Sequence, residues 1–161
     1  MMNKNKVAKI LLALSCSFLA TKLHAGLGET LEQAIQHYGP VVKQEQSEHL
    51  PQSEAGMMYE FNKDGFSIQI RLVGGRTAWI LYLRDDRPIY ETEIRTLLEN
   101  NAEGATWSTG TQMPNRTLKK KITFTRADSL ADAEYEELGT YHGLLIMAKA
   151  WRHATSPTSG L

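Results

Sequence analysis

The chain has 161 residues, a formal net charge of zero and a single cysteine. This length is enough for one domain that buries its own hydrophobic core, and it is short for a multidomain protein. With one cysteine the chain cannot form an internal disulfide, so the stability of the fold must come from its core.

The first 25 residues have the composition of a secretory signal peptide. Lys4, Lys6 and Lys9 precede an apolar run over residues 10–20, and small residues then lead to Ala25. The apolar run is shorter than the roughly 20 residues that a membrane-spanning helix needs, so we expect no transmembrane span. We therefore predict cleavage after Ala25 and an exported mature chain, either periplasmic or secreted.

Cys16 leaves a lipid-anchored alternative open. The signal of a lipoprotein ends in a cysteine that receives the lipid, but residues 13–15 lack the leucine usually found before it. The apolar run also continues past Cys16. A lipid-anchored envelope assembly factor is therefore a hypothesis that depends on this one residue.

Removal of the signal peptide would change the net charge. Four of the 18 Lys and Arg residues lie in the first 25 positions and none of the 18 Asp and Glu residues do, which leaves a net charge of −4. Recognition of phosphates requires a basic excess on one face, so we expect no nucleic-acid partner.

Residues 57–84 carry two turn signals that predict a three-stranded antiparallel meander. Residues 66–72 alternate apolar and polar, and Gly74-Gly75 suits a two-residue hairpin turn. Asp64-Gly65 predicts a second turn, which brings Met57, Tyr59 and Phe61 to the same face. If Val73 pairs with Arg76, the core face contains the pairs Leu72–Thr77, Ile70–Trp79, Ile68–Leu81 and Phe66–Leu83.

Two short amphipathic helices flank this meander. Thr30 and Gln33 form a capping box for a helix that ends at Gly39-Pro40, with Leu31, Ala34, Ile35 and Tyr38 on one face. A second helix is predicted from Glu91 to Asn101, with Ile94, Leu97 and Leu98 on one face. We predict an α+β fold in which both helices cover one face of an antiparallel sheet, within a single domain at 26–153.

The remaining segments are less regular. Residues 42–55 are polar and predict a surface connection, and 154–161 predict a disordered tail. Strands are predicted near Trp107, over 121–125 and over 142–149. Residues 128–138 fit both a helix and a strand, because their apolar residues match both periods, and the pattern alone slightly favours a helix.

Several of these patterns together resemble small exported bacterial proteins of unknown function. The patterns are Gly-Glu-Thr-Leu-Glu-Gln at 28–33, Tyr-Gly-Pro-Val at 38–41 and Glu-Ile-Arg-Thr-Leu-Leu-Glu-Asn-Asn at 93–101, followed by Trp107. Ala-Asp-Ala-Glu-Tyr at 131–135 is similar to a strand near the end of these proteins. The resemblance implies a strand over 130–135 and an architecture, and it implies no activity.

The sequence contains no recognisable catalytic or metal-binding motif. His37, His49, His142 and His153 have no partner at the spacing of metal ligands, and the predicted mature chain has no cysteine and no Gly-x-Ser-x-Gly elbow. We therefore predict no catalytic, metal-binding or cofactor-binding residue. An enzyme whose site is assembled from scattered carboxylates and histidines is the alternative.

The predicted meander leaves a mixed face opposite its core face. By the register above, this face presents Gln69, Arg71, Ile80 and Tyr82. Exposed aromatic residues beside arginine are typical of interfaces, so these four residues are the predicted binding face. Cover by the C-terminal strands is the alternative. The leading functional hypothesis is a small exported binding module without enzymatic activity, whose partner is an unidentified protein or envelope component.

Overall fold

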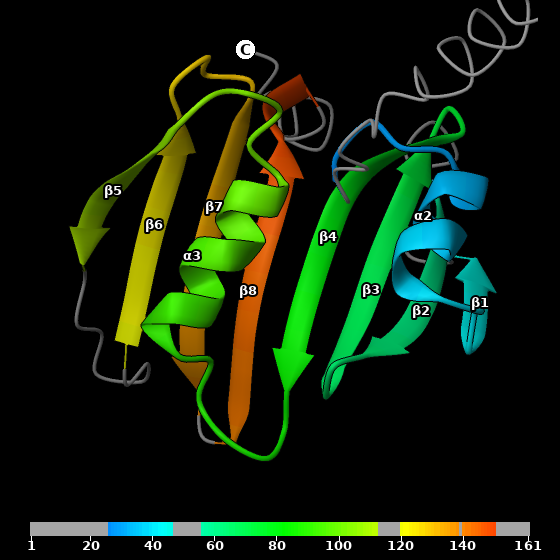
Figure 1. Cartoon of the computed structure of the whole chain (residues 1–161), viewed down its shortest axis with the longest axis horizontal. Helices are drawn as coiled ribbons and strands as arrows, with labels where there is room; N and C mark the ends of the chain where they lie inside the picture. Colours follow the sequence, from blue (N-terminus) through cyan, green and yellow to red (C-terminus); the bar gives the residue numbers. More distant parts are fainter. Residues whose placement is uncertain (1–25, 47–55, 113–119, 139, 151–161) are drawn as a thin grey trace, which may run out of the picture.

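The computed structural model describes residues 26–46, 56–112, 120–138 and 140–150. These residues form one eight-stranded antiparallel sheet and two α-helices, so the chain has an α+β fold (Figure 1). The predicted signal peptide at 1–25 and the predicted tail at 154–161 lie outside the described residues.

The sheet consists of two four-stranded meanders, each of which follows a helix. The first half contains α2 (Leu31–Tyr38), β1 (Lys43–Gln46), β2 (Met57–Lys63), β3 (Phe66–Val73) and β4 (Arg76–Arg84). The second half contains α3 (Glu91–Asn100), β5 (Trp107–Gln112), β6 (Lys120–Arg126), β7 (Ala131–Leu138) and β8 (Tyr141–Ala148). The strand order is β1-β2-β3-β4-β8-β7-β6-β5, so the halves join where β4 pairs with β8 (Figure 1).

A β-bulge in β4 changes the predicted register of the β3–β4 hairpin. Val73 pairs with Arg76 and Leu72 with Thr77, as predicted, but Arg71 then pairs with Trp79, which leaves Ala78 without a partner. Every pair beyond the bulge is offset by one residue. The core pairs are therefore Ile70–Ile80 and Ile68–Tyr82.

The bulge corrects the predicted faces of β4. Ile80 is fully buried and Tyr82 is 2% exposed, so both lie in the core. Trp79, Leu81 and Leu83 were predicted in the core, and this was wrong, because they share the other face with Ser67, Gln69 and Arg71. Apolar residues occupy consecutive positions from Ala78 to Leu83, so the sequence fits both registers.

The β2–β3 hairpin and both helices agree with the sequence-based predictions, except that Ile35, predicted on the apolar face of α2, is 39% exposed. Tyr59 pairs with Ile70 and Phe61 with Ile68, as the Asp64-Gly65 turn requires. The Thr30–Gln33 capping box begins α2, and Gly39 ends it with a φ of 95°. The buried side chains of α3 are Ile94 and Leu98.

The second meander settles the ambiguous segment in favour of a strand. Residues 131–138 form β7, which pairs with β6 on one side and β8 on the other. Its buried residues Ala131, Ala133 and Tyr135 alternate with half-buried acidic residues. Within the predicted surface connection at 42–55, residues 43–46 form the exposed edge strand β1. None of the helices among the described residues is long and apolar enough to cross a membrane.

The bulge predicts which alanine substitutions in β4 destabilise the fold. We expect Ile80→Ala to lower the free energy of unfolding by about 2–5 kcal/mol, because it leaves a cavity in the core. Leu81→Ala should cost less than half as much, because Leu81 is half-buried on the other face. Urea denaturation of both variants measures the difference. An equal or larger loss for Leu81→Ala would contradict the bulged register.

Candidate functional site

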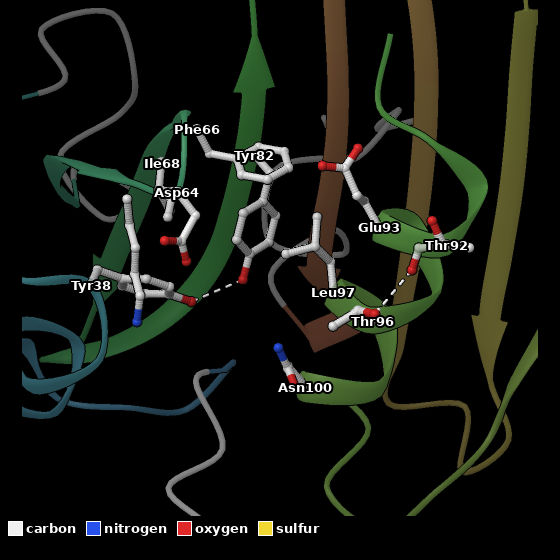
Figure 2. A pocket seen from close by; sticks show the side chains of 11 residues that line it. Tyr38, Asp64, Phe66, Ile68, Tyr82, Thr92, Glu93, Thr96, Leu97 and Asn100 are labelled. Atoms are coloured by element: carbon white, nitrogen blue, oxygen red, sulfur yellow. Dashed lines mark hydrogen bonds between the residues drawn. The ribbon is translucent and has the colours of Figure 1, made fainter.

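A pocket of about 340 Å³ is lined by residues from α2, from the β2–β3 hairpin, from β4 and from α3 (Figure 2). Phe66, Ile68 and Tyr82 supply apolar surface from the strands, and Leu97 adds more from α3. Polar groups come from Lys63 and Asp64 at the hairpin turn and from the exposed residues Thr92, Thr96 and Asn100 of α3. The pocket thus combines an apolar floor with a polar rim, which is the usual composition of a small-molecule site.

The inner end of the pocket contains a hydrogen-bonded pair of phenols. The hydroxyl oxygens of Tyr38 and Tyr82 are 2.9 Å apart, and both side chains are buried (Figure 2). Asn101, which is fully buried at the end of α3, donates from Nδ2 to the Tyr82 oxygen over 3.2 Å. The two phenols therefore share one hydrogen bond but carry two protons. One phenolic proton has no acceptor within this group of three side chains.

Burial keeps both phenols protonated. Loss of hydration raises the pKa of Tyr38 far above its ordinary value of 10, and the neighbouring Tyr82 and Glu29 raise it further. Loss of hydration is also the largest cause of the raised pKa of Tyr82. Both hydroxyls are therefore hydrogen-bond donors throughout the physiological pH range, and neither serves as a base.

An ion-pair cluster around Glu93 fixes the outer wall of the pocket. Arg87 donates to both carboxylate oxygens over 2.7 Å, and Arg84 donates to Oε1 over 3.1 Å. The backbone amide of Tyr90 donates to Oε2, which completes the N-terminal cap of α3. These contacts, led by the hydrogen bond from Arg87, lower the pKa of Glu93 to about 2. The carboxylate is therefore a fixed charge.

Arg84 connects this cluster to the β2–β3 hairpin. Its guanidinium donates from Nη2 to the carbonyl oxygen of Asp64 over 3.0 Å and lies 4.3 Å from the centre of the Phe66 ring. A guanidinium over an aromatic face adds a favourable electrostatic contact. The side of the pocket formed by the hairpin is therefore tied to the start of α3.

The lining of the pocket contains two phenolic hydrogen-bond donors and a fixed negative charge. Its lining contains no histidine, cysteine or serine, and its phenols and the Glu93 carboxylate do not exchange protons near neutral pH. Across residues 26–150, where they are described, no three His, Cys, Asp or Glu side chains form a group that could hold a metal ion.

The structure separates the four residues of the predicted binding face. Tyr82 lines the pocket and Ile80 lies in the core, whereas Gln69 and Arg71 lie on the other face of the sheet beside Trp79. The guanidinium of Arg71 is 5.7 Å from the centre of the Trp79 ring. The single predicted face is therefore wrong, because the bulge inverts β4 relative to β3. The alternative was that the C-terminal strands cover the face with Gln69 and Arg71, but β8 pairs with β4 and extends the same sheet.

Sequence analysis missed Tyr38, Glu93 and Asn101 as site residues. Tyr38 was predicted only as the last apolar residue of a helix, and Glu93 only as a residue within the second predicted helix. The sole signal for Asn101 was its place at the end of a predicted helix. Their contacts join segments far apart in the chain, so local patterns do not predict them.

A second cavity of about 460 Å³ lies between α3 and strands β5 and β6. Its lining includes the apolar side chains of Ile94, Leu98, Trp107, Ile122 and Phe124. It borders Lys120, which directly follows residues 113–119, outside the described part of the chain. The pocket beside Tyr82 is the candidate site because two buried phenols that hydrogen-bond to each other belong to its lining.

No protein-family model matches the chain, and neither a curated protein nor a solved structure shows significant similarity to it. The resemblance to small exported bacterial proteins therefore stays a prediction, and the function must be argued from the site.

The Glu93 cluster predicts a pH-dependent contribution to stability. At pH 7 we expect Glu93→Gln to lower the free energy of unfolding by about 1–2 kcal/mol, because charge-assisted hydrogen bonds are lost. Partial exposure of the carboxylate keeps the loss within this range. The folded-state pKa lies below the ordinary value of 4.5, so the contribution is complete above pH 4.5 and disappears as the pH falls towards 2.

Urea denaturation of the wild type and Glu93→Gln between pH 7 and pH 2 measures this contribution. Glu91→Gln is the matched control, since Glu91 is exposed in the same turn of α3 and pairs only with exposed Arg95 among the described residues. A difference between wild type and Glu93→Gln that stays constant down to pH 2 would show that the carboxylate is not stabilised in this way.

Proposed function

We propose that the protein is an exported binding module without enzymatic activity, and that its ligand is a small, partly apolar molecule with an oxygen acceptor. The observation that supports this is the surplus phenolic proton of the Tyr38–Tyr82 pair beside the apolar floor of the pocket. A buried donor without an acceptor is costly, and a ligand oxygen would satisfy it. Carbonyl, carboxylate and sulfonate oxygens all qualify.

The dimensions of the pocket support a ligand of limited size. A volume of about 340 Å³ lies at the lower end of the range for sites that enclose small organic molecules. The aromatic ring of Phe66 and the aliphatic side chains of Ile68 and Leu97 suit the apolar part of such a ligand. Lys63, Asp64 and the threonines of α3 lie where a polar end would meet solvent.

We also infer that both helices cover the same face of the sheet. Tyr38 at the end of α2 and Asn101 just after α3 contact the same Tyr82 hydroxyl, and Figure 1 draws both helices in front of the strands. Each helix precedes a four-stranded meander, and the two meanders meet through an antiparallel pair. This arrangement makes the space between the helices the entrance to the pocket.

The enzymatic alternative has less support from this site. General acid–base catalysis requires a group whose pKa lies near the working pH. Burial raises the pKa values of both phenols above the neutral range, and the arginines lower the pKa of Glu93 below it. The lipid-anchored alternative depends on Cys16, and the intact mass of the exported protein distinguishes it from cleavage after Ala25.

The binding proposal can be tested with 8-anilinonaphthalene-1-sulfonate, which joins an apolar ring system to a sulfonate acceptor. We expect saturable binding with one site per chain in isothermal titration calorimetry. Thr96→Trp should weaken it by more than about tenfold, because the indole would occupy the pocket from an exposed position on α3. Replacement of both phenols, Tyr38→Phe together with Tyr82→Phe, should weaken it by roughly three- to tenfold, because it removes the surplus phenolic proton.

Gln36→Trp is the matched control for the added indole. Gln36 is exposed on α2 and does not line the pocket, so its substitution should leave the dissociation constant unchanged. Equal affinities for the wild type and Thr96→Trp would place the probe elsewhere and contradict the proposed site.

A further inference from the structure

Asn101 has a buried oxygen without a hydrogen-bond partner. The residue is fully buried, and its Nδ2 donates to the carbonyl oxygen of Leu97 over 2.8 Å and to the Tyr82 hydroxyl. A carbonyl oxygen only accepts, so the contact with Leu97 fixes which end of the amide is Nδ2. The opposite atom, Oδ1, is therefore oriented away from Leu97, and no described group donates to it.

Gly26 lies beside this unpaired oxygen. A Cβ atom at Gly26 would be 3.2 Å from Asn101 Oδ1 and 3.9 Å from the carbonyl oxygen of Asn100. Gly26 and Leu27 are buried, so the main chain at this point belongs to the packed structure. Any side chain at position 26 would crowd the amide oxygen of Asn101.

Two main-chain hydrogen bonds hold the segment that follows Gly26. Gly28 donates to the carbonyl oxygen of Thr77 over 2.7 Å, and Thr77 donates back to the carbonyl oxygen of Glu29 over 2.8 Å. These bonds attach residues 28–29 to the start of β4. The position of Gly26 is therefore set by the sheet on one side and by the end of α3 on the other.

The end of α3 favours a positive charge at this position. The last carbonyl groups of a helix carry a partial negative charge, and α3 has no basic residue in its last turn. Arg126 donates to the carbonyl oxygen of Asn101 from Nη1, but its guanidinium also pairs with Glu103 and Asp128. These two carboxylates balance the charge of Arg126, so Arg126 would not strongly repel a second cation beside Asn101.

We propose that Asn101 Oδ1 accepts a hydrogen bond from the α-ammonium group of Gly26 in the mature protein. This inference rests on the proposed export, because the group forms when water hydrolyses the Ala25–Gly26 peptide bond to an Ala25 carboxylate and a Gly26 ammonium. An ammonium has three donors where the peptide amide of the precursor has one. Removal of the signal peptide thus supplies the missing partner of Asn101.

The test compares chains that differ by one residue at the start. The mature chain from Gly26 and a chain that begins at Ala25 are each prepared from a cleavable fusion, and their unfolding is followed in urea. We expect the Gly26 chain to have a roughly tenfold smaller equilibrium constant for unfolding. In an Asn101→Ala background, the added alanine should have no such effect. Equal stability of the two wild-type chains would contradict the inference.

Labelling of the α-amine keeps the inference testable if Asn101→Ala does not fold. The folded Gly26 chain should react with 2-pyridinecarboxaldehyde, which is selective for α-amines, at least tenfold more slowly than a peptide of residues 26–33. Equal rates would contradict the inference. The intact mass of the exported protein tests the proposed export separately: a start at Cys16 or elsewhere refutes cleavage after Ala25, whereas a Gly26 start with a freely reactive amine refutes only the contact with Asn101.

Discussion

The unpaired Ala78 in β4 determines the layout of the whole site. Side chains alternate between the two faces of a strand, so one extra residue moves every later side chain of β4 to the other face. It places the hydroxyl of Tyr82 inside the molecule, where a polar group requires hydrogen-bond partners. Tyr38 and Asn101 supply them. A strand register thereby dictates where the end of each helix must lie.

These contacts leave two incomplete hydrogen bonds close to one another. In the phenol pair one hydroxyl proton has no acceptor, and in the Asn101 amide the oxygen Oδ1 has no donor. The phenols line the pocket, and Asn101 Oδ1 lies beside Gly26. Because native structures leave few buried polar groups unpaired, each of the two calls for a further hydrogen-bond partner.

Much of the fold could be predicted from the sequence because the relevant signals are local. The capping box at Thr30, the turns at 64–65 and 74–75 and the β-branched content of 121–125 each act within a few residues. The faces of β4 could not be predicted, since Trp79, Ile80, Leu81 and Tyr82 are all compatible with a core. The distinction depends on the pairing of β4 with β8 and on the hydrogen bond that Asn101, just after α3, donates to the Tyr82 hydroxyl. Both are nonlocal contacts.

The candidate site was predicted only in part for the same reason. Tyr82 was selected because an aromatic residue beside arginine suggests an interface, and it does line the pocket. Arg71, however, lies on the other face. The Glu93 cluster joins Arg84 at the end of a strand to Arg87 in the following loop, and spacing along the chain carries no signature of such a cluster.

The central position of the β4–β8 pair also affects how fast the chain can fold. Ile80 and Ile146 face each other at the middle of the sheet, although nearly the whole second half of the molecule separates them in sequence. Each meander can form from neighbouring hairpins. Pairing of β4 with β8 closes a long loop, and the entropic cost of this closure slows folding. Slow closure of the sheet would lengthen the period in which a newly made chain is still unfolded.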